Sequence, residues 1–92
     1  MSITSTLIIT NENKTNAQQV IDGLRDIDGL TSLTGDNLFN VELTDGTDSF
    51  WCATGWTSLA DVTALLNSGY VHHVQLPADL DTAMEATGLT RV

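Results

Sequence analysis

The spacing of apolar residues predicts strands and helices that alternate along the chain. Ile3–Thr10 places its side chains on two faces with a period of two, which is typical of a strand. Residues 17–27 repeat apolar side chains at spacings of three and four, which predicts a helix that ends at Asp28-Gly29. Thr15 and Gln18 match a capping box at the start of this helix.

A β-hairpin is predicted in the middle of the chain. Leu38–Leu43 and Ser49–Thr54 both alternate, and the run between them contains Asp45-Gly46, a strong short-range turn signal. In the second of these strands the alternation places Phe50 and Cys52 on one face and Trp51 on the other.

The second half of the chain predicts a helix, a strand and a further helix. Thr57 or Ser58 is expected to cap a helix that buries an apolar stripe consisting of Leu59, Val62, Leu65 and Leu66. Tyr70–Leu76 is then predicted as a strand rich in Val, Tyr and His. Pro77 is expected as the first residue of a third helix, with Asp79 and Asp81 in its first turn and Gly88 at its end.

This order of elements favours the α+β class and one domain over residues 1–92. It is the pattern of a ferredoxin-like β-α-β-β-α-β sandwich with an added C-terminal helix, in which the strand order is 4-1-3-2 and both crossover helices cover one face. An alternative is a three-stranded antiparallel meander with helices on one face. It requires Leu30–Thr34 to be a further strand that turns at Gly35-Asp36-Asn37.

The charge balance changes the range of expected partners. The chain contains twelve carboxylates and only three bases (Lys14, Arg25 and Arg91), which gives a formal net charge of −9. Direct binding to nucleic acid or to an anionic membrane is disfavoured because such binding depends on Lys and Arg, and a basic protein partner is favoured. The chain has no apolar run of membrane-spanning length and no signal-peptide pattern, so we expect a cytoplasmic protein.

No residue constellation predicts catalysis, a metal site or a cofactor. His72 and His73 are neighbours on a predicted strand, where their side chains point to opposite faces and cannot chelate one ion. Cys52 lies within an apolar strand, where burial makes a thiol unreactive. The carboxylates in turns and helices are explained by turn chemistry and helix dipoles. We therefore expect a protein that is not an enzyme.

Candidate partner-binding residues combine a tryptophan with surface acids. If Phe50 and Cys52 face the helices, Trp51 projects onto the opposite face of the sheet. The residues expected to share that face with it include Ile8, Val71 and His73. In the alternative, the C-terminal helix covers Trp51 through Leu80 and Met84. The candidate binding residues are Trp51, Glu42, Asp45, Asp48, Asp36, Asp22 and Asp26.

Three functions remain open at this level. The first is an inhibitor that binds a basic, nucleic-acid-handling protein and mimics nucleic acid. In its predicted fold and its charge, the chain is similar to small phage-encoded inhibitors of host defence, which include anti-CRISPR proteins. The second is a homo-oligomeric structural or assembly subunit, or a homodimer, that pairs through the edge strand Tyr70–Leu76 or through the open face of the sheet. The third is a regulatory domain that binds a small molecule.

Overall fold

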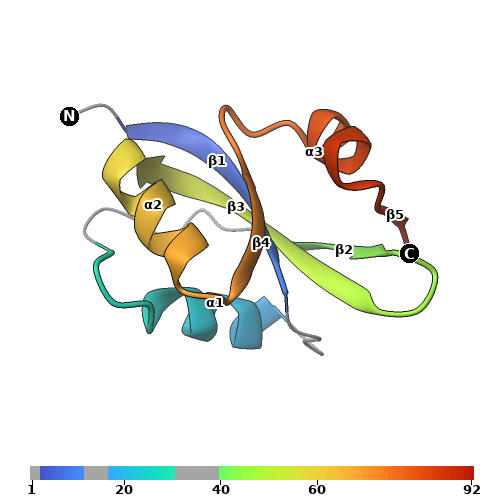
Figure 1. Cartoon of the computed structure of the whole chain (residues 1–92), viewed down its shortest axis with the longest axis horizontal. Helices are drawn as coiled ribbons and strands as arrows, with labels where there is room; N and C mark the ends of the chain where they lie inside the picture. The colour runs from blue at the N-terminus through green and yellow to red at the C-terminus, as the bar shows by residue number, and fades with distance from the viewer. Residues whose placement is uncertain (1–2, 12–16, 31–39) are drawn as a thin grey trace.

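Three helices and five strands form an α+β sandwich in the computed structural model, which describes residues 3–11, 17–30 and 40–92. The elements in chain order are β1 (Ile3–Thr10), α1 (Ala17–Arg25), β2 (Asn40–Thr44), β3 (Ser49–Ser58), α2 (Leu59–Asn67), β4 (Val71–Gln75), α3 (Leu80–Thr87) and β5 (Thr90–Arg91). The strands form one sheet in the order β4-β1-β3-β2-β5, and every pairing is antiparallel. In Figure 1, β4 crosses in front of β1 and β3, while α2 and α3 lie on opposite sides of it.

β1 lies near the centre of the sheet because it pairs with both β3 and β4. Ile8 is opposite Ala53 on one side and Val74 on the other, so one face of the sheet carries a row of apolar side chains. Leu7 and Ile9 point to the other face and are equally buried. A strand with apolar residues on both faces requires a covering layer on each side, and both layers are present.

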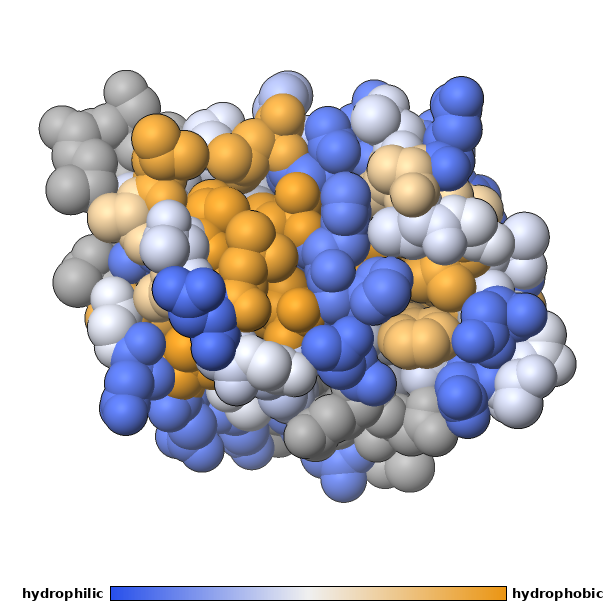
Figure 2. All heavy atoms as spheres, viewed as in Figure 1, coloured by the Kyte–Doolittle hydropathy of each residue, from blue (hydrophilic) through white to orange (hydrophobic). Residues whose placement is uncertain are grey.

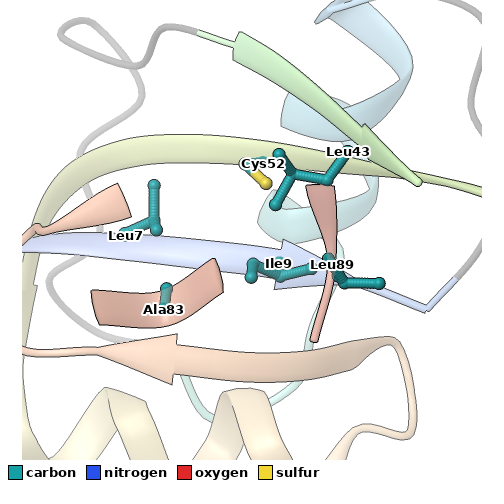
Figure 3. Close-up of a cluster of buried hydrophobic side chains, with 6 residues drawn as sticks. All are labelled: Leu7, Ile9, Leu43, Cys52, Ala83 and Leu89. Carbon is teal, nitrogen blue, oxygen red and sulfur yellow. The ribbon is translucent and has the colours of Figure 1, made fainter. Parts of the chain in front are cut away.

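The first layer consists of α1 and α2. Its core contains the buried residues Ile8, Leu24, Ala53, Leu65 and Val71, with Ile27, Leu30, Trp51, Tyr70 and Val74 packed around them. The second layer is α3. Its core contains Leu7, Ile9, Leu43, Cys52, Ala83 and Leu89, and Figure 3 shows these side chains gathered between β1, β3 and the α3 segment.

This arrangement corrects one prediction from the sequence. Phe50 and Cys52 do share a face opposite Trp51, as the alternation predicts. However, it is the Trp51 face that α1 and α2 cover, and Leu80 and Met84 of α3 pack on the Cys52 face instead of over Trp51. Alternation reports which side chains share a face, whereas the path of each connection decides which helices cover it.

The predicted hairpin is confirmed, with a four-residue loop. β2 and β3 pair from Thr44 opposite Ser49 to Asn40 opposite Ala53. Gly46 has a φ of 99°, a left-handed conformation that glycine adopts without steric cost. β3 is longer than the predicted strand Ser49–Thr54, because it continues to Ser58 and therefore contains Trp56.

The helix ends follow local hydrogen bonding. Ser58 is both the last residue of β3 and the N-cap of α2, and its hydroxyl accepts from the Asp61 backbone N–H at 3.3 Å. The N-cap of α3 is Asp79, so the prediction that Pro77 is the first helical residue is wrong. Asp79 competes successfully because its carboxylate can accept hydrogen bonds from Thr82, whereas Pro77 offers only a fixed φ. Gly88 closes α3 with a φ of 75°, as predicted.

Some predictions fall on residues that the structure does not describe. These are the capping box at Thr15, the alternative strand and turn within residues 31–37, and the start of the strand predicted at Leu38. β5 was not predicted. It pairs Thr90 with Thr44 and Arg91 with Leu43, and so adds a partner to the outer edge of β2.

Candidate functional site

The candidate acids lie in separate parts of the fold, and Glu42 is on β2. Asp22 and Asp26 are on α1 and in the turn after it, whereas Asp45 and Asp48 are in the β2–β3 loop. In Figure 1, α1 lies along the lower border and the β2–β3 hairpin reaches the right-hand end, so these acids border the molecule instead of forming one cluster. Asp36 lies outside the described residues.

Asp45 has the turn-forming role that the sequence suggested. One carboxylate oxygen of Asp45 accepts backbone N–H groups of Thr47 and Asp48, each at 2.8 Å. These hydrogen bonds, first that from Asp48 and then that from Thr47, hold the pKa of Asp45 below its usual value. Asp45 is therefore a fixed anion at the tip of the hairpin, and its side chain remains exposed to a partner.

A shallow groove lies between the C-terminal ends of α1 and α2. It has a volume of about 500 Å³ and is lined by Gly23, Asp26, Ile27, Asp28, Ala64, Asn67, Ser68 and Tyr70. Asp26 and Asp28 are both exposed. A lysine or arginine side chain of a partner protein matches the charge of this groove.

Trp51 and Glu42 are cross-strand neighbours. They lie opposite each other in the β2–β3 register, and both are partly buried. Because Trp51 packs against the core beneath α1 and α2, it is a supporting residue of that core with a partly accessible surface. Its role in partner binding stays a prediction.

The two histidines depart from the predicted alternation. Ile9 pairs with His73 and Thr10 with Val71, so His72 is an extra residue in β4 and forms a bulge. Val71 and Val74, three residues apart, consequently pack on the same face. The ring of His72 lies 5.7 Å from that of Phe50, and its Nδ1 lies 3.2 Å from Asn11 Oδ1. The described residues contain no group of three or more His, Cys, Asp or Glu side chains that could hold a metal ion.

Cys52 is buried in the core beneath α3. Its relative exposure is 0%, and burial raises the pKa of the thiol to about 12. The thiolate is therefore a negligible species at neutral pH. The position fits a small apolar residue, as the sequence predicts.

The prediction that α2 buries Leu59 and Leu66 is wrong. Leu59 and Leu66 of α2 are 71% and 48% exposed, whereas Leu65 and Asp61 face the sheet. Trp56 of β3 is also 44% exposed. The signal that was missed is Asp61. Ser58 caps α2, so Asp61 is the third residue of the helix (position N3). The position of Asp61 determines which face of α2 packs against the sheet.

A second depression, of roughly 300 Å³, lies between the sheet and the start of α3. Its lining consists of Ser5, Leu7, Val41, Thr54, Ala78, Asp79 and Leu80. Trp56 is opposite Ser5 in the β1–β3 register, so it is near the rim of this depression.

No family model matches this chain, and neither a curated protein nor a solved structure matches it significantly. Within the described ranges, none of the helices has both the length and the apolar character needed to cross a membrane.

Proposed function

We propose that this chain is a non-enzymatic protein-binding domain, an acidic inhibitor that occupies the basic surface of a nucleic-acid-handling protein. One observation carries the proposal. Across the described surface, the exposed carboxylates are Asp22, Asp26, Asp28, Asp45, Asp48, Asp79, Asp81 and Glu85, whereas the exposed bases are Arg25 and Arg91. Arg91 also lies 3.7 Å from Asp81, which reduces its free positive charge.

Binding follows from charge and position. Carboxylates on α1 and on the hairpin occupy the place of phosphates on a basic partner, and the groove beside Asp26 and Asp28 receives a lysine or arginine side chain. The rigid Asp45 turn limits the entropy lost when the hairpin binds. A defence nuclease, the target class of anti-CRISPR proteins, has the required basic surface.

We also propose that the fold is a ferredoxin-like sandwich extended by α3 and β5. The strand order β4-β1-β3-β2 and the chain order β1-α1-β2-β3-α2-β4 support this assignment. The fold alone implies no function.

The proposal is tested by capture and by competition with DNA. The immobilised chain is exposed to a host lysate, and retained proteins are challenged with a short DNA duplex and with salt rising from 50 to 500 mM. We expect basic nucleic-acid-binding proteins that both treatments release, because both act on the same electrostatic contact.

Three charge-matched variants locate the contact. Asp26→Asn with Asp28→Asn changes the groove, and Asp45→Asn with Asp48→Asn changes the hairpin. Asp81→Asn with Glu85→Gln, on α3, is the control that removes the same charge. We expect the first two to retain less partner than the control. If all three retain as much partner as the original chain, the electrostatic proposal is wrong.

A further inference from the structure

The side of the molecule formed by α2 and β4 carries little charge. Residues 56–78 contain one carboxylate, Asp61, and no lysine or arginine. Asp61 is fully buried. The remaining eleven carboxylates and all three bases belong to other parts of the chain, so −8 of the net charge of −9 comes from residues outside this segment.

The exposed surface of α2 is an apolar stripe. We define the α2 stripe as Leu59, Val62 and Leu66, which follow one another at spacings of three and four. Leu59 and Leu66 are exposed and Val62 is half-buried. Figure 2 shows hydrophobic surface gathered between α2 and β4, with hydrophilic surface over β4 and along the lower border.

Beside the stripe lies an edge of the sheet. β5 pairs with the outer edge of β2, whereas the sheet order places β4 at the other end, with no neighbouring strand among the described residues. The bulge at His72 interrupts this edge. A partner is therefore more readily bound by the side chains of α2 than by backbone hydrogen bonds along the β4 edge.

We propose that a second copy of this chain docks on this side, with the two α2 stripes packed against each other across a two-fold axis and the β4 edges beside them. Spacings of three and four residues are those used at helix–helix contacts. A two-fold axis brings the same stripe from each copy together, so the contact is self-complementary. None of the exposed carboxylates named above is a residue of α2 or β4.

Charge favours a second copy over a basic partner at this position. A basic partner would find no exposed carboxylate on α2 or β4, and therefore would gain no ion pair there. Two copies repel each other through their distant charges, and salt screens that repulsion over a Debye length of about 8 Å at physiological ionic strength. Dimerisation should therefore strengthen as salt rises, opposite to the partner binding proposed above.

Sedimentation equilibrium of the purified chain at 50 and 500 mM NaCl tests the inference. We expect a reversible monomer–dimer equilibrium with a lower dissociation constant at 500 mM. Leu59→Gln with Leu66→Gln preserves charge and approximate side-chain length, and should raise the dissociation constant about 100-fold by removing four leucine side chains from the contact.

Val92→Gln is the matched control, because Val92 is 72% exposed but lies outside α2 and β4. It should leave the dimer unchanged, and thermal melts should show that both variants are folded. A wild-type chain that stays monomeric at 500 mM NaCl overturns the inference. So does a dimer that salt dissociates, or one that the leucine substitutions leave intact. None of these results bears on the proposed function, because that function depends on the exposed acids and is tested separately by partner capture.

Discussion

The ring of Tyr70 lies against the backbone of Gly23, so α1 and the start of β4 approach each other where a side chain is absent. A β-carbon at Gly23 would lie 2.5 Å from Cζ and 2.9 Å from Cε1 of Tyr70. Tyr70 is itself packed against the core beneath α1 and α2, which restricts movement of its ring. Glycine is therefore required here for close approach, although it weakens an isolated helix.

Gly23→Ala should destabilise the protein by up to about 2 kcal/mol. The cost of overpacking, about 1–3 kcal/mol, exceeds the gain in helix propensity of about 1 kcal/mol. In a Tyr70→Ala background the ring is gone, so the same substitution should instead stabilise the fold. Urea denaturation of the four proteins measures this change of sign. An equal effect of Gly23→Ala in both backgrounds would contradict the role assigned to the ring.

Cys52 should be unreactive in the folded protein. Because burial raises its pKa to about 12, a thiol reagent such as Ellman's reagent should label it at pH 8 only when the chain unfolds. Cys52→Ser should cost about 1–3 kcal/mol, since a hydroxyl would be buried among Ile9 and Leu43. Cys52→Ala, which adds no polar group, is the control and should cost less. Rapid labelling under native conditions would show that the thiol is accessible.

Asp79 should be necessary for the stability of α3. Its carboxylate accepts from the backbone N–H of Thr82 at 3.2 Å and from the Thr82 hydroxyl at 2.6 Å. Asp79→Ala removes both acceptors and should lower the melting temperature, whereas Asp79→Asn keeps an acceptor and should lower it less. The two variants are compared by circular dichroism melts. Equal melting temperatures for the two variants would contradict the capping role of Asp79.

Stability should fall in acid partly through Asp45 and Asp79. The pKa of each is lowered, that of Asp45 by backbone hydrogen bonds from Asp48 and Thr47 and that of Asp79 by hydrogen bonds from Thr82. A lowered folded pKa gives stability that is present above the unfolded pKa, near 4, and is lost as pH falls through the folded pKa. Denaturation between pH 2 and 6 should show a shallower acid loss for Asp45→Asn with Asp79→Asn. A slope identical to that of the original chain would mean that neither carboxylate contributes.

Much of the fold is predictable because alternation and turn signals are local. Period two separates Cys52 from Trp51, and Asp45-Gly46 marks the hairpin, since both follow from the backbone geometry of a few residues. The choice of face is not local. It depends on where α1, α2 and α3 return to the sheet, which no short sequence window contains.

The candidate surfaces were predictable only in part. Composition gave the excess of acids, but Leu59 and Leu66 were expected in the core because hydrophobicity alone does not set the rotation of a helix. The Ser58 cap and the buried Asp61 set it instead, with Leu65 turned inward. His73 was misplaced, because the extra residue His72 shifts the alternation after it and brings His73 opposite Ile9.

The direct passage from β3 into α2 at Ser58 has a mechanical consequence. Ser58 is the last residue of β3 and pairs with Ile3 of β1, and α2 begins at the next residue. Loosening of the β1–β3 pair at this end should therefore also loosen the first turn of α2.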